Sequence, residues 1–107
     1  MNLKSVLLFA AAAALASTNL LASADLAKQS GCLACHQADK KVVGPAYQDV
    51  ARKYAGQKGA EALLVKSVTE GGNGKWGEIP MPPKGGSTTV TDAEIKTLVR
   101  WILAGAK

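Results

Sequence analysis

The chain is 107 residues long, with two cysteines, one histidine and a formal net charge of +5. This length allows one small domain, which is only marginally stable unless a disulfide, a metal or a prosthetic group supports it. The lysines are scattered and do not form a basic stripe with aromatic residues between the charges. This pattern excludes an ordinary nucleic-acid interface.

Residues 1–24 are predicted to be a cleavable secretory signal peptide. Lys4 supplies the positively charged n-region, and residues 6–16 form an apolar run. Ala22-Ser23-Ala24 is an A-x-A cleavage signal. The alternative is an uncleaved membrane anchor, but the apolar run is shorter than the roughly 20 residues that a spanning helix needs. Removing 24 of 107 residues, with their single lysine, leaves 83 residues and a net charge of +4. Residues 25–107 are expected to be one domain in the periplasm.

The stretch Cys32-Leu33-Ala34-Cys35-His36 follows a short helix expected from Asp25 to Ser30. A C-x-x-C-H run is typical of c-type haem attachment, in which two thiols form thioethers with the haem vinyl groups and the imidazole binds the iron. Two intervening residues let one turn of chain present both sulfurs along one porphyrin edge. The sequence therefore predicts one covalently bound haem c, with its iron.

Other interpretations of Cys32, Cys35 and His36 stay open. A structural zinc site needs four donors, so a carboxylate or a second chain would have to complete it. A thioredoxin-like thiol oxidoreductase would place its cysteines beside a βαβ pattern, which the sequence does not show. A plain disulfide suits an exported protein but leaves His36 without a role.

The remaining helices are separated by Gly and Pro. Val43-Gly44-Pro45 is a turn, and helices are expected at 46–54 and 60–70, where apolar residues recur at helical spacing. The side chains expected to face inward from the 60–70 helix are Leu63, Leu64 and Val68. No segment shows the sustained alternation of a strand, so the predicted fold class is all-α.

The last helix has the clearest signature. Thr91-Asp92-Ala93-Glu94 is a capping box, and Gly105 is a plausible stop. Its apolar stripe consists of Ile95, Leu98, Val99, Ile102 and Leu103. We expect this stripe to be core.

A Gly- and Pro-rich stretch, 71–90, is expected to be irregular and functional. The prolines of Ile79-Pro80-Met81-Pro82-Pro83 forbid a helix and stiffen the chain. Met81 is the only methionine left once the leader is removed, so it is the candidate thioether ligand, although a core role is the usual one for methionine. With His36 and Met81 in both axial positions, the iron would transfer electrons rather than act as an enzyme centre.

Three stretches together resemble the short bacterial class I cytochromes c of the c-551/c-552 type. They are Cys32–His36, Val43-Gly44-Pro45-Ala46-Tyr47 and Gly74-Lys75-Trp76-Gly77-Glu78-Ile79-Pro80-Met81-Pro82-Pro83. The resemblance covers nearly all of residues 25–107. It implies a small class I cytochrome c fold, with about four short helices enclosing one covalently attached haem.

The resemblance also implies roles for single residues. The thioether residues are Cys32 and Cys35, and the axial iron ligands are His36 and Met81. The Pro45 carbonyl is expected to accept the His36 ring N–H, and the Trp76 indole N–H to approach a haem propionate. Trp101 has no such role and is expected to pack. Relatives commonly carry an Asn where this chain has Lys84, and that difference bears on the orientation of Met81.

The resemblance further implies a soluble respiratory electron carrier. A monomer is expected because no large apolar stripe is left over once the haem is enclosed, and the short apolar run and scattered lysines predict neither a stable membrane anchor nor nucleic-acid binding. Its donor would be a quinol-oxidising membrane complex, and its acceptor a nitrite reductase, a peroxidase or a terminal oxidase. Lysines that could border the exposed haem edge are Lys28, Lys40, Lys41, Lys75 and Lys84. The alternative is that Met81 dissociates, and that the open iron then binds a small ligand or works on peroxide.

Overall fold

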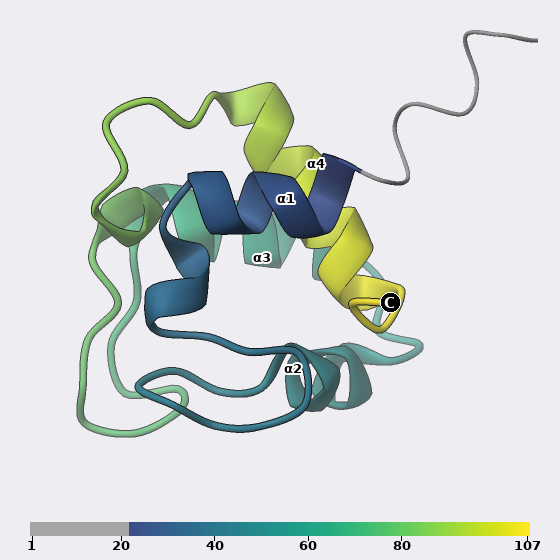
Figure 1. Cartoon of the computed structure of the whole chain (residues 1–107). Coiled ribbons are helices and arrows are strands. Elements are labelled where there is room, and N and C mark those ends of the chain that lie inside the picture. Colours follow the sequence, from purple (N-terminus) through teal and green to yellow (C-terminus); the bar gives the residue numbers. More distant parts are fainter. Residues whose placement is uncertain (1–21) are drawn as a thin grey trace, which may run out of the picture.

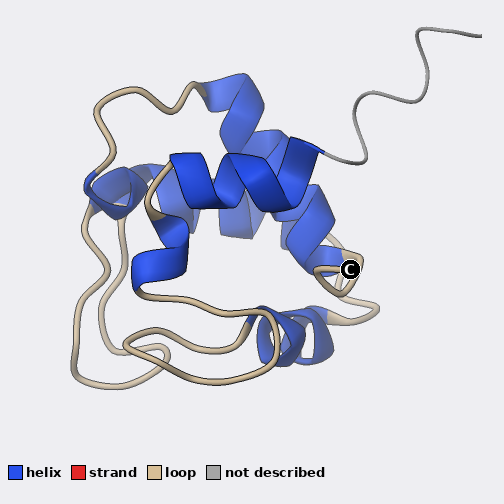
Figure 2. Ribbon diagram, viewed as in Figure 1, coloured by secondary structure: helices blue, strands red, loops and turns tan. Residues whose placement is uncertain are grey.

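The computed structural model describes residues 22–107, and over these residues the chain is helical, with no strand (Figure 2). The elements are α1 (Ala22–Gln29), η1 (Cys32–Ala34), α2 (Tyr47–Tyr54), α3 (Ala60–Glu70), η2 (Pro83–Gly86) and α4 (Asp92–Leu103), where η marks a short 3₁₀ helix. The predicted all-α fold class is confirmed. Most of the predicted signal peptide lies outside the described residues.

Helix α4 is the centre of the fold and packs against α1, α2 and α3 (Figure 1). Its capping box is present, because the Glu94 backbone N–H donates to Thr91 Oγ1 at 3.2 Å and the Thr91 N–H donates to Glu94 Oε1 at 3.0 Å. The predicted stripe is largely buried, with Ile95 and Val99 fully enclosed and Leu103 half-buried at the end of the helix. One local signature therefore fixes both the start and the inward face of this helix.

Helix α1 begins earlier than expected. It starts at Ala22 rather than Asp25, and Ser23 is buried. Small residues of an A-x-A signal also have good helix propensity, since alanine is the best helix former. The helix ends as expected, because Gly31 follows in a left-handed conformation (φ 79°).

The expectation that Leu63 faces inward is wrong. Leu63 is 41% exposed, whereas the neighbouring Leu64 is buried. Successive residues of an α-helix point about 100° apart, so only one of two adjacent leucines faces α4. An ion pair between Arg100 and Glu61, 3.0 Å apart, also links α4 to α3 at the surface.

The loop from Gly71 to Val90 runs along one side of the molecule, on the left of Figure 1. It is less irregular than expected, because Gly72 and Met81 exchange two backbone hydrogen bonds of 3.1 and 2.8 Å. Its prolines exclude an α-helix, but Pro83 opens the short η2 turn, which packs against α3. The loop is thereby tied to the helical body near Met81.

Candidate functional site

The two cysteines lie on a single turn of chain. Residues 32–34 form η1, and the backbone N–H groups of Cys35 and His36 both donate to the Cys32 carbonyl, at 3.2 and 3.0 Å. Both thiols are free, with Cys32 half-buried and Cys35 exposed. The turn thus carries two separate thiols and an imidazole within five residues.

The environment of Cys32 does not suit a redox-active thiol pair. Burial raises the pKa of the Cys32 thiol, and this effect outweighs a hydrogen bond from Tyr47 that lowers it. A thioredoxin-like attacking cysteine requires a lowered pKa, because the thiolate is the nucleophile. The raised pKa of Cys32 therefore argues against a disulfide-cycling role, in which this thiol would have to attack as a thiolate.

The His36 ring is held in one orientation by the backbone. Its Nδ1 atom lies 2.9 Å from the Pro45 carbonyl oxygen, the contact that the resemblance implies. A carbonyl oxygen only accepts hydrogen bonds, so in the neutral ring Nδ1 carries the hydrogen and donates it. The lone pair is then on Nε2, which is the form of imidazole that binds a metal.

The loop after His36 brings Gly44 and Pro45 back to the ring. The backbone N–H groups of Val43 and Gly44 donate to the Cys35 carbonyl at 3.2 and 2.7 Å, and the Tyr47 N–H donates to the Gln37 carbonyl at 2.9 Å. Any side chain at Gly44 would collide with the imidazole, since a Cβ atom there would lie 2.3 Å from His36 Cε1. The sequence indicated only a turn at this glycine, whereas the structure shows a close approach.

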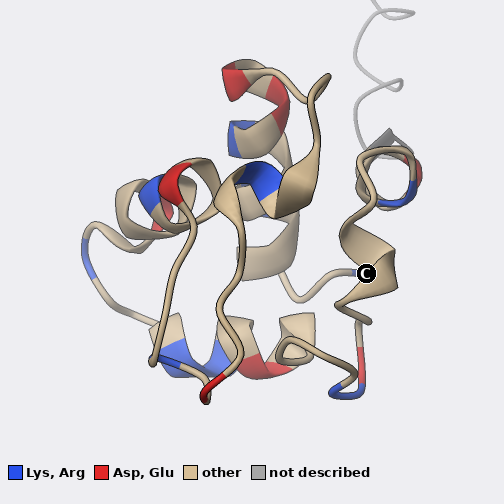
Figure 3. Ribbon diagram, turned by 90° about the vertical axis from the view of Figure 1, so that its left-hand side faces the viewer, with Lys and Arg blue, Asp and Glu red and all other residues tan. Residues whose placement is uncertain are grey.

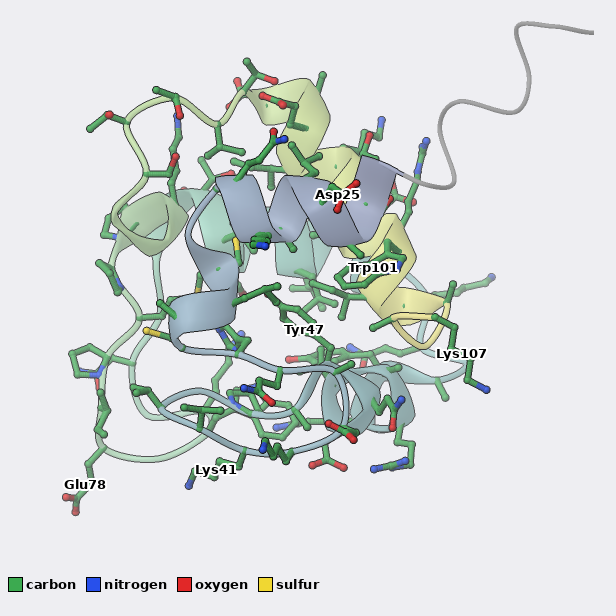
Figure 4. All side chains as sticks on the ribbon, in the orientation of Figure 1. Asp25, Lys41, Tyr47, Glu78, Trp101 and Lys107 are labelled. Carbon is green, nitrogen blue, oxygen red and sulfur yellow. The ribbon has the colours of Figure 1, made fainter. Side chains whose placement is uncertain are left out.

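Two aromatic contacts support the same ring. Tyr47 stacks on His36, with ring centroids 5.0 Å apart and an interplanar angle of 17°, and Trp101 meets Tyr47 edge-on at 5.6 Å. Figure 4 shows Tyr47 and Trp101 next to each other; Tyr47 is buried and Trp101 half-buried. Burial, and secondarily the nearby Cys32, raises the pKa of Tyr47. The helical spacing of apolar residues predicted a core position for Tyr47. Its place two residues after Pro45 is the one signal that points to the histidine.

Met81 belongs to a different segment, the 71–90 loop. Besides its two backbone bonds to Gly72, its carbonyl lies so close to Gly71 that a Cβ atom there would be 2.5 Å away. Gly71 also has a positive φ of 79°, which glycine adopts without strain. Met81 is half-buried. Its backbone is therefore fixed by two consecutive glycines.

Trp76 lies on the same loop and is 36% exposed. The ammonium group of Lys53, on α2, lies 4.4 Å from the centre of its indole ring, within cation–π range. This contact was not predicted. It connects the loop to α2, and it places a positive charge beside the tryptophan that the resemblance associates with a propionate.

Residues 22–107 contain no group of three or more His, Cys, Asp or Glu side chains that could hold a metal ion. No helix within the same residues is long and apolar enough to cross a membrane.

Comparison with known proteins places this site in a family. The family model described as "Cytochrome c" matches residues 21–106. The chain belongs to the cytochrome c family. It is 54% identical to cytochrome c-552 of Hydrogenobacter thermophilus over 83 residues, which cover 78% of this chain and 81% of the relative. It is 53% identical to cytochrome c-551 of Pseudomonas aeruginosa over 79 residues, which cover 74% of this chain and 72% of the relative.

A solved structure agrees with these sequence relatives. The crystal structure of Nitrosomonas europaea cytochrome c552 matches with a TM-score of 0.71 and 49% identity, covering 77% of this chain and 98% of that one. The resemblance to the c-551/c-552 group and the class I cytochrome c fold are both confirmed. This cytochrome is accordingly a haem electron carrier with one covalently attached haem c and its iron.

The described residues fit that group. Cys32 and Cys35 are free thiols one turn apart. The His36 Nδ1–H donates a hydrogen bond to the Pro45 carbonyl. Gly44 has no side chain, so the imidazole ring occupies the space beside it. Each chemical role that covalent haem requires on this side thus has a residue in place.

Proposed function

We propose that this cytochrome is a periplasmic single-electron carrier whose haem iron has His36 and Met81 as axial ligands. Cys32 and Cys35 form the thioethers, and Pro45 accepts the His36 ring hydrogen. The observation that carries the proposal is the 2.9 Å contact between His36 Nδ1 and the Pro45 carbonyl, because it leaves Nε2 as the metal-binding nitrogen.

The chain's part in electron transfer is to keep both ligands in place. When bound, the haem supplies an iron that cycles between Fe(II) and Fe(III). Pro45 fixes the His36 tautomer and raises the basicity of its free nitrogen, while Tyr47 limits rotation of the ring. The Gly72 bridge holds the backbone of Met81. Ligands that stay in position in both oxidation states reduce the reorganisation that opposes transfer.

This arrangement supports a carrier rather than an enzyme. With His36 and Met81 both holding the iron, no coordination site would be left for a substrate. The thioether of Met81 favours Fe(II) and raises the reduction potential. We place the Trp76 indole N–H near a haem propionate, where the charge of Lys53 above the same ring would add to the attraction.

An absorption spectrum of the haem-loaded protein in both oxidation states tests the ligands. Sharp low-spin bands, together with the weak long-wavelength band of Met–Fe(III), are expected for the natural protein. Met81→Ala should lose that band and bind carbon monoxide when reduced, whereas Leu63→Ala, a change at an exposed leucine, should keep the band. A natural protein without the band would contradict Met81 ligation.

Export is part of the proposal, with residues 1–24 as the signal peptide and 25–107 as the mature domain. Mass spectrometry of protein isolated from the periplasm should give a chain that begins at Asp25 and carries one haem mass without free thiols. Helix α1 begins at Ala22, so the mature chain would keep the part of this helix from Asp25 onward. A chain that retains residues 1–24 would contradict cleavage.

The proposed partners are redox proteins: a quinol-oxidising membrane complex as donor, and a nitrite reductase, a peroxidase or a terminal oxidase as acceptor. Lys and Arg are spread over several helices and loops (Figure 3). The lysines proposed to border the haem edge are Lys28, Lys40, Lys41, Lys75 and Lys84. Attraction by these charges should make the reaction with an acidic partner slow down as salt rises. A rate that does not change across a salt series would remove this docking role.

A further inference from the structure

Lys84 has an unfavourable backbone conformation. Its φ and ψ are 55° and 24°, in the left-handed region. Within residues 22–107 only one other non-glycine residue has a positive φ, Ala106, also at 55°. A residue with a Cβ atom is disfavoured in this region, because the Cβ crowds the following carbonyl oxygen.

The local turn imposes this conformation. The Gly85 N–H donates to the Pro82 carbonyl at 2.9 Å, which closes a four-residue turn with Lys84 in third place. A positive φ at the third position of such a turn is normally supplied by Gly or Asn. The Ser87 N–H also donates to the Lys84 carbonyl, at 3.0 Å, so the strained residue is held by hydrogen bonds on both sides.

The turn follows Met81 directly. Met81 is fixed on one side by its bridge to Gly72, and on the other side Pro82 is the first residue of the turn. The end of the Met81 side chain approaches the same turn, since a Cβ atom at Gly85 would lie 4.0 Å from Met81 Cε. Because Met81 directly precedes the turn and its side chain approaches Gly85, moving Met81 away would disturb this turn, and an opened turn would release the strain at Lys84.

We infer that Lys84 is a positioning residue whose strained backbone favours release of Met81 from the haem iron. The inference rests on the proposed ligation by Met81. Strain that is present when the loop is closed and absent when it is open shifts the equilibrium toward the open form by roughly fivefold. The rate and extent of ligand exchange at this iron are then set by the residue type at position 84.

Imidazole is a suitable probe, because it binds ferric haem only where Met81 has left. The full haem-loaded protein would be titrated with imidazole and the dissociation constants compared. Lys84→Gly and Lys84→Asn should each bind imidazole about three- to fivefold more weakly than the natural protein, since both residues tolerate the left-handed region. The pair separates strain from flexibility, because Asn lacks the extra freedom of Gly.

Two control variants isolate the cause. Lys84→Ala removes the charge but keeps the Cβ atom, so it should bind imidazole within twofold of the natural protein. Ala106→Gly relieves the same backbone conformation just beyond the C-terminal end of α4, away from the Met81 turn, and should leave imidazole binding unchanged. Equal dissociation constants for Lys84→Gly, Lys84→Asn and Lys84→Ala would overturn the inference.

The spectrum separates the two possible failures. If the Met–Fe(III) band is absent from the natural protein, the proposed ligation fails, and this inference fails with it. If the band is present and the imidazole constants of the position-84 variants are all alike, the ligation stands and only the role of Lys84 is refuted.

Discussion

The sharpest structural test of the His36 side is the substitution Gly44→Ala. The added methyl group would lie 2.3, 2.7 and 2.9 Å from Cε1, Nδ1 and Nε2 of His36, where ordinary contacts are 3.4 to 4 Å. The ring cannot move aside freely, because one face stacks on Tyr47 and Nδ1 is bonded to Pro45. Either the backbone of the 43–45 turn shifts or the ring leaves its partners.

The cost follows from these two contacts. Overpacking of a tight site costs about 1 to 3 kcal/mol, and loss of the hydrogen bond from His36 to Pro45 adds about 1 kcal/mol. We therefore expect Gly44→Ala to lower the free energy of unfolding by about 2 to 4 kcal/mol. A domain of this size has a total stability of only about 4 to 12 kcal/mol, so the effect is large.

Urea unfolding of the haem-loaded protein, followed by circular dichroism, measures this difference. Gly72→Ala is the matched control, because a Cβ atom there meets nothing within 4 Å and its φ is not positive. The control should unfold within about 0.5 kcal/mol of the natural protein. If Gly44→Ala is equally stable, the reasoning that the ring needs this space is refuted.

Four further substitutions have clear expected outcomes. Burial raises the pKa of Tyr47 above its unfolded value of about 10. Above about pH 10 only the unfolded state loses this proton, so the free energy of unfolding should fall as the pH rises. Tyr47→Phe should flatten that fall in a pH series of unfolding curves. Thr91→Ala removes the capping box and should cost about 1 kcal/mol in thermal or urea unfolding, and no change would contradict the cap. Leu64→Ala should cost about 2 to 4 kcal/mol and Leu63→Ala less than about 0.5, so equal losses would contradict the assigned helix face.

The parts of the fold that the sequence predicted are those with local causes. The capping box of Thr91 and Glu94, followed by an apolar stripe, determines the start and face of α4 from neighbouring residues alone. Helices α2 and α3 were predicted to within one residue, because Gly and Pro limit both. The cysteine spacing likewise indicated haem attachment before any fold was known.

The parts that were missed depend on distant contacts. The sequence cannot tell Leu63 from Leu64, because the choice is made by where α4 packs. The stacking of Tyr47 on His36, eleven positions apart in sequence, depends on the path of the loop between them. The start of α1 was missed for another reason: Ala22 and its neighbours fit a cleavage signal and a helix equally well.

The two proposed ligands are supported in different ways, and this difference has a consequence that can be measured. The loop of His36 is closed by several backbone bonds, its ring is bonded to Pro45, and it stacks on the core residue Tyr47. Met81 is held by one bridge and by a turn whose third residue is strained. Perturbing the His36 side should therefore require the core to adjust, and it should appear in global unfolding. Perturbing the turn at Lys84 should appear in imidazole binding and leave the urea midpoint nearly unchanged, because the loop can open while the helices stay packed.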